Sequence, residues 1–301
     1  MVPPYLGRRL ANSRFIGLRG LRYHRLEWGT SSPDRPTLLM LHGWMDVAAS
    51  FQFVVDAMRG ERHVVALDWR GFGLTQTPPA ADSYAFADYL GDLDAAIDAL
   101  AGDRPLDLAG HSMGGNVAMI YAGVRPGRIR RLVNLEGFGM PQTSAQQAPK
   151  RYAQWLDELK ARPLLRDYAS RDEVAERLMK NNPRLGPAKA AWLSAHWAEQ
   201  RDDGRWHILG DPAHKRVNPV LYRKDEVLEC WKRIEAPVLW VEGDSTDTSK
   251  WWGDRYPRSD FESRLAVVPR LQRERLADCG HRLHHDQPEA LAALLESFLL
   301  P

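Results

Sequence analysis

A serine stands between two glycines in the stretch LDLAGHSMGGNVAM, residues 106–119. Gly110-His111-Ser112-Met113-Gly114 fits the pattern G-x-S-x-G, placed between an apolar run that predicts a strand and a pattern that predicts a helix. A serine on such a sharp turn is held in strained backbone geometry, and glycines two positions away let the chain pass. A serine in this setting can attack an acyl carbon. The alternative is a serine that merely caps the following helix.

Two further motifs favour the nucleophile over the cap. MLHGWMD, residues 40–46, follows a predicted strand, and its turn offers the backbone N–H of Trp44 toward the serine. The N–H of Met113 would be the second donor, so that the two could stabilise an oxyanion. ADCGHRLHHDQPEAL places His281 in a loop after the last predicted strand, from which it can reach Ser112 and accept its proton.

The elements that would position these residues alternate between β-rich and helical patterns. This alternation predicts an α/β fold, with a mostly parallel eight-stranded sheet and helices on both faces. The predicted strands are 14–19 and 21–28, which form a hairpin around Gly20, then 37–41, 63–67, 106–109, 131–135, 238–242 and 273–277. The predicted helices are 47–58, 86–101, 113–123 and 288–299.

Residues 138–234 interrupt this alternation. They contain helical patterns and one turn-and-strand element, DDGRWHI, but no convincing pair of buried strands. A structureless loop of this length is improbable, so the segment is interpreted as a mainly helical cap inserted after the sixth strand. The domains are then 1–137 and 235–301 for the two parts of the core, and 138–234 for the cap. Its tryptophans are expected mainly to hold the cap helices together, and some to line an apolar pocket.

The motifs HGW, DWRGFG, GHSMGG and CGHRLHHDQPEAL, in this order over residues 37–299, together resemble the α/β-hydrolase superfamily. LVNLEGFGMP and DDGRWHILGDPAHKR look most like the serine-hydrolase-like branch, which is related to capped esterases and C–C bond hydrolases. The resemblance implies that Ser112 is the nucleophile and His281 the base, with a carboxylate that orients the imidazole.

The resemblance does not settle which carboxylate this is. Typical members carry an aspartate three residues after the glycine that ends the strand 238–242, and here that position is Thr246. Asp247, one residue later, is the favoured candidate. Glu136 follows closely, because it ends the strand beside that of the serine, where some members carry their acid. Asp244 is a more distant third.

Composition narrows the possible partners. The chain carries 41 basic and 39 acidic side chains, a formal charge of +2, so nucleic-acid binding has no support. No apolar run is long enough for a signal peptide or a membrane helix, which predicts a cytoplasmic protein without a membrane partner. The two cysteines, Cys230 and Cys279, are too few for a disulfide framework and are expected to serve packing.

Several histidines invite a metal interpretation that the sequence does not favour. His281, His284 and His285 form H-x-x-H-H without a third ligand at a helical spacing, so neither a metal nor another cofactor is expected. His284 and His285 fit polar loop residues that lead into the last helix. His42 and His111 are expected to support the two oxyanion turns through hydrogen bonds.

The favoured function is a serine hydrolase that cleaves an ester, thioester or similar acyl bond of a small apolar substrate through an acyl-enzyme. Ser112 argues against epoxide hydrolases and haloalkane dehalogenases, which place an aspartate at the nucleophile position. Three alternatives stay open: hydrolysis of a carbon–carbon bond or cofactor-free perhydrolysis by the same three residues, and a non-catalytic protein that binds a small ligand. The natural substrate and the oligomeric state are left undetermined.

Overall fold

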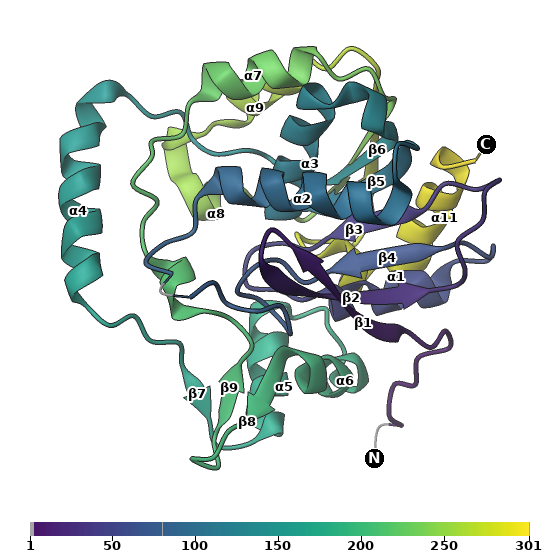
Figure 1. The fold of residues 1–301 in the computed structure, drawn as a ribbon, viewed down its shortest axis with the longest axis horizontal. Helices are drawn as coiled ribbons and strands as arrows, with labels where there is room; N and C mark the ends of the chain where they lie inside the picture. The colour runs from purple at the N-terminus through teal and green to yellow at the C-terminus, as the bar shows by residue number, and fades with distance from the viewer. Residues whose placement is uncertain (1–2, 80, 301) are drawn as a thin grey trace.

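The computed structural model describes residues 3–79 and 81–300, which form a mostly parallel eight-stranded sheet with helices on both faces (Figure 1). The predicted fold class is therefore confirmed. The strand order is β1-β2-β4-β3-β5-β6-β10-β11. The strands are β1 (Asn12–Leu18), β2 (Leu21–Trp28), β3 (Leu38–Leu41), β4 (Val64–Leu67), β5 (Leu106–His111), β6 (Ile129–Leu135), β10 (Val238–Gly243) and β11 (Leu271–Leu276).

The antiparallel part of the sheet is the predicted hairpin. β1 pairs with β2, and β2 pairs with β4, both antiparallel, whereas the strands from β4 to β11 pair in parallel. Arg19 and Gly20 connect β1 to β2, and both have positive φ, at 47° and 79°. A two-residue turn of this kind matches the right-handed twist of the strands that it joins.

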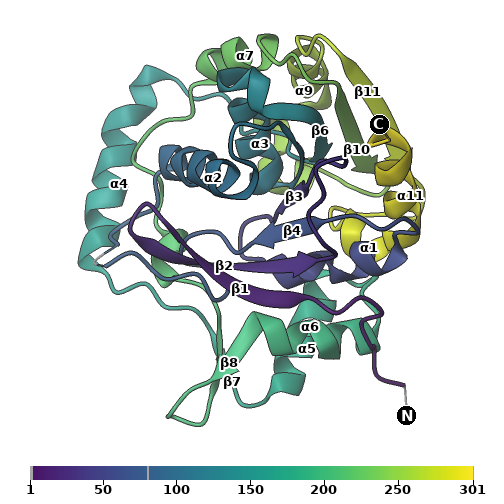
Figure 2. The same ribbon diagram turned by 45° about the vertical axis from the view of Figure 1, so that its right-hand side comes forward.

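The residues of β3 alternate between the two hydrophobic clusters of the core. Leu38 and Met40 pack with residues of α1 (Gln52–Ala57) and α11 (Pro288–Phe298). Leu39 and Leu41 pack with residues of α2 (Phe86–Ala101), α3 (Met113–Val124), α7 (Lys224–Lys232) and α9 (Arg258–Leu265). Figure 2 shows α1 and α11 on one side of the strands and α2 and α3 on the other. Because each face of a parallel sheet is covered, its strands are apolar on both faces.

The segment after β6 is largely helical, as predicted. It contains α4 (Ala148–Lys160), α5 (Arg171–Asn181) and α6 (Pro187–Trp197). A small sheet of order β7-β9-β8 joins β7 (Asp167–Tyr168), β8 (Ala198–Gln200) and β9 (Trp206–Ile208), so the predicted turn-and-strand element is present as the β8–β9 hairpin. Residues of α5 and α6 belong to the same hydrophobic cluster as α1, which ties this part of the segment to the core.

One helix of the same segment lies in the main layer. α7 packs on α3, so closely that a Cβ on Gly123 would collide with the carbonyl oxygen of Cys230. Trp231 of α7 is 1% exposed within the core cluster of α2 and α3. The proposed domain boundary at residue 234 thus falls after a helix that covers the main sheet.

The remaining helices are short. They are α8 (Ser249–Trp252) and α10 (Leu283–Asp286), with 3-10 turns at Ala48–Phe51, Pro126–Arg128, Ala145–Gln147, Pro212–Lys215 and Gly253–Arg255. Within the described part of the chain, no helix has both the length and the apolar character to cross a membrane.

Candidate active site

Ser112 occupies the sharp turn between β5, which ends at His111, and α3, which begins at Met113. Its backbone has φ 52° and ψ −114°, a conformation that costs a non-glycine residue free energy. The neighbouring glycines provide clearance, since a Cβ on Gly110 would meet the backbone of Gly114, and one on Gly114 would meet the backbone at Leu41. The steric reason for the predicted glycine spacing is therefore present in the structure.

His281 lies in the loop between β11 and α10 and contacts both the serine and a carboxylate. Its Nε2 is 3.0 Å from Ser112 Oγ, and its Nδ1 is 2.6 Å from Glu136 Oε2. When Nδ1–H donates to the Glu136 carboxylate, the Nε2 lone pair of the neutral ring is directed at the hydroxyl group. The three side chains form one hydrogen-bonded chain that can carry a proton away from Ser112.

Glu136 is fixed in place immediately after β6. The residue is 1% exposed and has φ 55°, so the chain turns sharply where its side chain enters the site. Its Oε1 accepts a hydrogen bond from the N–H of Gly243 at 2.7 Å, at the end of the neighbouring strand β10. One carboxylate oxygen thus anchors the side chain to the sheet, and the other holds His281.

Asp247, favoured as the partner of His281 on the basis of the sequence, points elsewhere. It is exposed, and its Oδ1 accepts hydrogen bonds from Ser249 N at 3.0 Å and from Ser249 Oγ at 2.5 Å. These bonds lower the pKa of Asp247 and place it at the start of α8. The expectation that Asp247 rather than Glu136 faces His281 is corrected, because the one-residue shift after Gly243 carries this carboxylate outward.

Asp244, the third candidate, supports the histidine loop from outside. Its carboxylate accepts hydrogen bonds from the N–H groups of Asp278 at 3.0 Å and Cys279 at 3.1 Å. Both donors precede His281 in the same loop. Asp244 therefore stabilises the approach to His281 without touching its ring.

Trp251 is a neighbour of His281 that the sequence analysis did not identify. The two rings are T-shaped, with centroids 4.5 Å apart, and Trp251 is 43% exposed. The tryptophan belongs to α8, whose first turn is held by Asp247, while Trp252 packs on Tyr256 at 5.1 Å. Trp251 thus forms an aromatic wall beside the ring of His281. In the sequence, its only signal was the pair of adjacent tryptophans that follows the displaced Asp247.

The two predicted oxyanion donors lie on either side of the serine turn. Met113 is the first residue of α3, so its N–H has no acceptor within the helix. The turn that contains Trp44 packs against Ser112, because a Cβ on Gly43 would lie 3.2 Å from Ser112 Cβ. Among the described residues, no hydrogen bond uses the N–H of Trp44. The arrangement is compatible with both donors facing a developing oxyanion.

His42 and His111 support these turns, as expected. His42 Nε2 accepts from the N–H of Trp69 at 2.9 Å, and the Trp69 indole donates to the carbonyl oxygen of His42 at 3.0 Å. His111 Nε2 donates to the carbonyl oxygen of His281 at 2.8 Å, which connects the serine strand to the histidine loop. Burial lowers the pKa of both rings, so they are neutral props.

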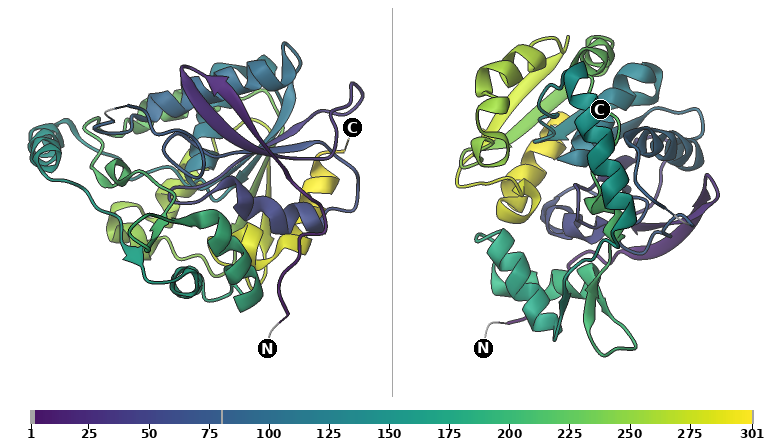
Figure 3. Two further views of the ribbon diagram at one scale, coloured as in Figure 1. Left: turned by 60° about the horizontal axis from the view of Figure 1, so that its bottom comes forward. Right: turned by 90° about the vertical axis from the view of Figure 1, so that its left-hand side faces the viewer.

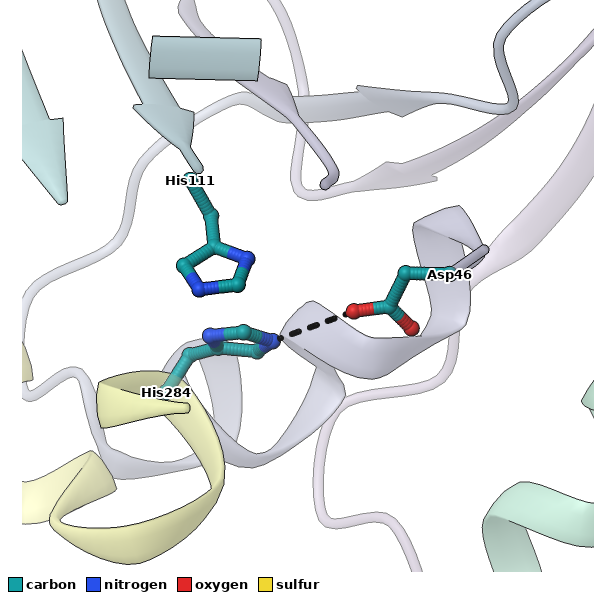
Figure 4. A group of neighbouring side chains, drawn as sticks. All are labelled: Asp46, His111 and His284. Carbon is teal, nitrogen blue, oxygen red and sulfur yellow. Dashed lines mark ion pairs between the residues drawn. The ribbon is translucent and has the colours of Figure 1, made fainter. Parts of the chain in front are cut away.

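His284 and His285 differ from the expected loop residues, because they are buried in α10. His284 lies beside Asp46 and His111, and the possible ligand atoms of these three lie within 4.8 Å of one another (Figure 4). Arg282 Nη1, however, is 3.1 Å from the same Asp46 oxygen that faces His284 Nε2 at 3.6 Å. A divalent cation would have to compete with this guanidinium, so the group is better explained as buried support for the histidine loop.

Backbone strain is concentrated around this site. Five non-glycine residues have positive φ among those described, and four of them are Met45, Ser112, Glu136 and Asp278. Met45 follows the proposed oxyanion turn, and Asp278 precedes His281 in its loop. Strain of this kind persists only where the surrounding structure fixes it, and it is common at functional sites.

The serine, histidine and carboxylate at the carboxyl edge of a mostly parallel sheet are those of an α/β hydrolase. Residues 36–288 match the model of the alpha/beta hydrolase fold family, and the chain belongs to that family.

Similar proteins include a serine hydrolase-like protein, an epoxide hydrolase and a thioesterase domain. A "serine hydrolase-like protein" of Danio rerio is 26% identical over 284 residues, which cover 91% of this chain and 84% of that protein. "Epoxide hydrolase 1" of Caenorhabditis elegans is 31% identical over 122 residues, 40% of this chain and 30% of that protein. Among solved structures, a thioesterase domain from the curacin biosynthetic pathway has a TM-score of 0.83 and 26% identity, covering 96% of this chain and 99% of that domain.

Proposed function

We propose that the protein is a serine hydrolase that cleaves an ester, thioester or related acyl bond through an acyl-enzyme. The observation that carries this proposal is the continuous hydrogen-bonded chain from Ser112 Oγ to His281 and from His281 to Glu136, at 3.0 and 2.6 Å. Each group has the contacts that its role requires, and the serine is half-buried on a turn with strained backbone geometry.

In this mechanism, Ser112 Oγ attacks the acyl carbon while His281 Nε2 accepts the hydroxyl proton. The carbonyl oxygen becomes an oxyanion that the N–H groups of Trp44 and Met113 stabilise. His281 then donates the proton to the leaving group as its bond to the acyl carbon breaks. Water then attacks the acyl carbon while His281 accepts a proton from it. His281 returns this proton to Ser112 Oγ as the bond between the serine and the acyl group breaks, which releases the acid and restores Ser112. Glu136 remains ionised and stabilises the imidazolium.

The choice of reaction rests on the nucleophile and on the exposed side chains near it. Epoxide hydrolases, to which parts of this chain are similar, need an aspartate nucleophile according to the family pattern, whereas this chain has Ser112. Trp44 and Trp251 are 50% and 43% exposed, and they flank the oxyanion turn and the histidine. An apolar acyl group suits such surroundings. The alternative of a non-catalytic binding protein drew its weight from the displaced aspartate, and Glu136 removes that argument.

A fluorophosphonate probe tests the proposal without knowledge of the substrate. We expect one probe molecule to attach per protein chain, and no attachment to Ser112→Ala. A folded wild-type protein that refuses the probe would refute the proposal. A series of p-nitrophenyl esters of increasing chain length then measures the acyl preference and separates ester hydrolysis from cleavage restricted to a carbon–carbon bond.

A further inference from the structure

The helix α4 has an apolar stripe that the protein does not bury. Ala148, Tyr152, Trp155, Leu156 and Leu159 recur at spacings of three and four residues, which places them on one side of the helix. None of the residues of α4 is buried, and Tyr152 and Leu156 are 52% and 51% exposed. By contrast, the sheet-covering helix α2 buries Leu93 and Ile97 completely.

α4 also stands apart from the layers of the fold. It is the outermost element on the left of Figure 1, and Figure 3 (left) shows it end-on at the edge of the molecule. It is tied to the segment 216–218 mainly through polar bonds, in which Val217 N donates to Glu158 Oε2 at 2.6 Å and Arg216 Nε donates to the Glu158 carbonyl oxygen at 3.3 Å. Trp155 and Leu159 of the stripe are half-buried, whereas Tyr152 and Leu156 remain exposed.

The charge around α4 is strongly positive. Residues 141–166, here called the α4 arm, carry five basic and two acidic side chains, and Asp157 is already paired with Lys160 at 3.2 Å. The adjoining segment 212–224 adds Lys215, Arg216, Arg223 and Lys224 and no acidic side chain, with Arg216 largely buried beside Asp82 and Arg223 paired with Glu226 at 3.5 Å. Since the whole chain has a formal charge of only +2, the rest of the molecule is net acidic.

We infer that the α4 arm docks on anionic lipid surfaces. A helix with tryptophan, tyrosine and leucine on one side and with lysine and arginine around it lies in the boundary between lipid headgroups and acyl chains. Anionic headgroups would complement the basic residues, and the boundary would cover the exposed stripe. The expectation of a protein without a membrane partner, drawn from the lack of a spanning segment, does not address this mode of binding.

Sedimentation with vesicles tests this inference with the full chain in the Ser112→Ala form, so that the result does not depend on the proposed catalysis. The protein should bind vesicles of equimolar phosphatidylcholine and phosphatidylglycerol at least about tenfold more strongly than vesicles of phosphatidylcholine alone. Added salt should weaken the binding. Leu156→Asp should reduce the partition coefficient about tenfold, because a leucine that enters the boundary is replaced by an anion.

Leu10→Asp is the matched control, since Leu10 is 86% exposed in the N-terminal segment, on the other side of the molecule from α4 (Figure 1). This variant should bind as the unchanged protein does. Lys150→Glu offers a second variant at an exposed position of α4 and should weaken binding to the anionic vesicles only.

The inference is overturned if the protein does not bind anionic vesicles, or if Leu156→Asp and Leu10→Asp bind alike. It is also overturned if Leu156→Asp abolishes a dimer in solution instead, which would assign the stripe to a second copy of the chain.

Discussion

The turns after β6 and β10 each carry a carboxylate at the same edge of the sheet, yet the two carboxylates have opposite surroundings. Glu136 is buried, has positive φ and holds His281 at 2.6 Å, whereas Asp247 is exposed and holds the start of α8 through Ser249. β6 and β10 are neighbours in the sheet, so both turns are close to the histidine loop.

This difference shows how one site divides two tasks between adjacent turns. The β6 turn supplies the charge that orients His281, and the β10 turn supplies the aromatic wall, because Asp247 holds the helix that carries Trp251. Asp247, in the region where the family usually carries its acid, thus has a structural contact, whereas Glu136 after the neighbouring strand contacts His281.

Replacement of the buried carboxylate should have the largest effect. We expect Glu136→Gln to lower kcat on a p-nitrophenyl ester by on the order of 10⁴-fold, because the neutral amide neither stabilises the imidazolium nor fixes the required tautomer. Steady-state kinetics of purified protein measure this loss. A decrease of only a few fold would mean that Glu136 is not the acid.

The aromatic wall should contribute less. Trp251→Ala is expected to lower kcat/KM about tenfold, because His281 loses the ring that confines it, whereas Trp251→Phe should keep most of the activity. The pH dependence of kcat/KM should also change in Trp251→Ala, which a purely structural loss would not produce. Equal activity and equal pH profiles for the alanine and phenylalanine variants would show that the wall has no positioning role.

Acid should weaken the support beneath the histidine loop. Burial lowers the pKa of His42, His111, His284 and His285, so these rings bind fewer protons in the folded state than in the unfolded state. The free energy of unfolding should therefore be retained above about pH 6.5 and fall below it, by up to about 1.4 kcal/mol per pH unit for each ring. Asp46 adds to the loss at lower pH: although burial opposes it, the neighbouring His284 ring and the charge of Arg282 hold the pKa of Asp46 well below its usual range.

Denaturant titrations between pH 7 and pH 5 measure how steeply the free energy of unfolding falls as the pH is lowered. His285→Gln should make this fall less steep, since one buried ring that takes up a proton on unfolding is removed. A free energy of unfolding that does not change between pH 7 and pH 5 would contradict the burial of neutral rings.

Replacement of the exposed carboxylate should have the smallest effect. Asn begins helices about as well as Asp, so Asp247→Asn should retain α8 and change kcat by no more than about twofold. The same ester assay measures the effect. A loss comparable to that of Glu136→Gln would contradict the division of tasks between the two turns.

The sequence was sufficient to predict the sheet, because its apolar runs and its G-x-S-x-G motif depend on local patterns. The positions of Ser112 and His281 followed from the same patterns. The partner of His281 did not, since Glu136 and Asp247 end adjacent strands and both can reach the edge of the sheet. The two differ in burial, in the positive φ of Glu136 and in its bond to Gly243 N, and these features arise from tertiary packing.

Two other features also depended on packing at a distance. Nothing in the local pattern of α7 distinguishes it from the other helices of residues 138–234, and its place in the main layer comes from the contact between Gly123 and Cys230. His284 and His285 looked polar in the sequence, but α10 buries them beside Asp46 and Phe53. Residue type did not predict the packing of α7 or the burial of the two histidines, because the residues that they contact are far away along the chain.

If Ser112, His281 and Glu136 act together, the rate of fluorophosphonate labelling of Ser112 depends on the other two residues. The measurement compares wild-type protein, Glu136→Gln and Asp247→Asn side by side, with no assumption about the substrate. Asp247→Asn is predicted to react at the wild-type rate and Glu136→Gln at least about a thousandfold more slowly. Rapid labelling of Glu136→Gln together with slow labelling of Asp247→Asn would show that Asp247, and not Glu136, acts with His281.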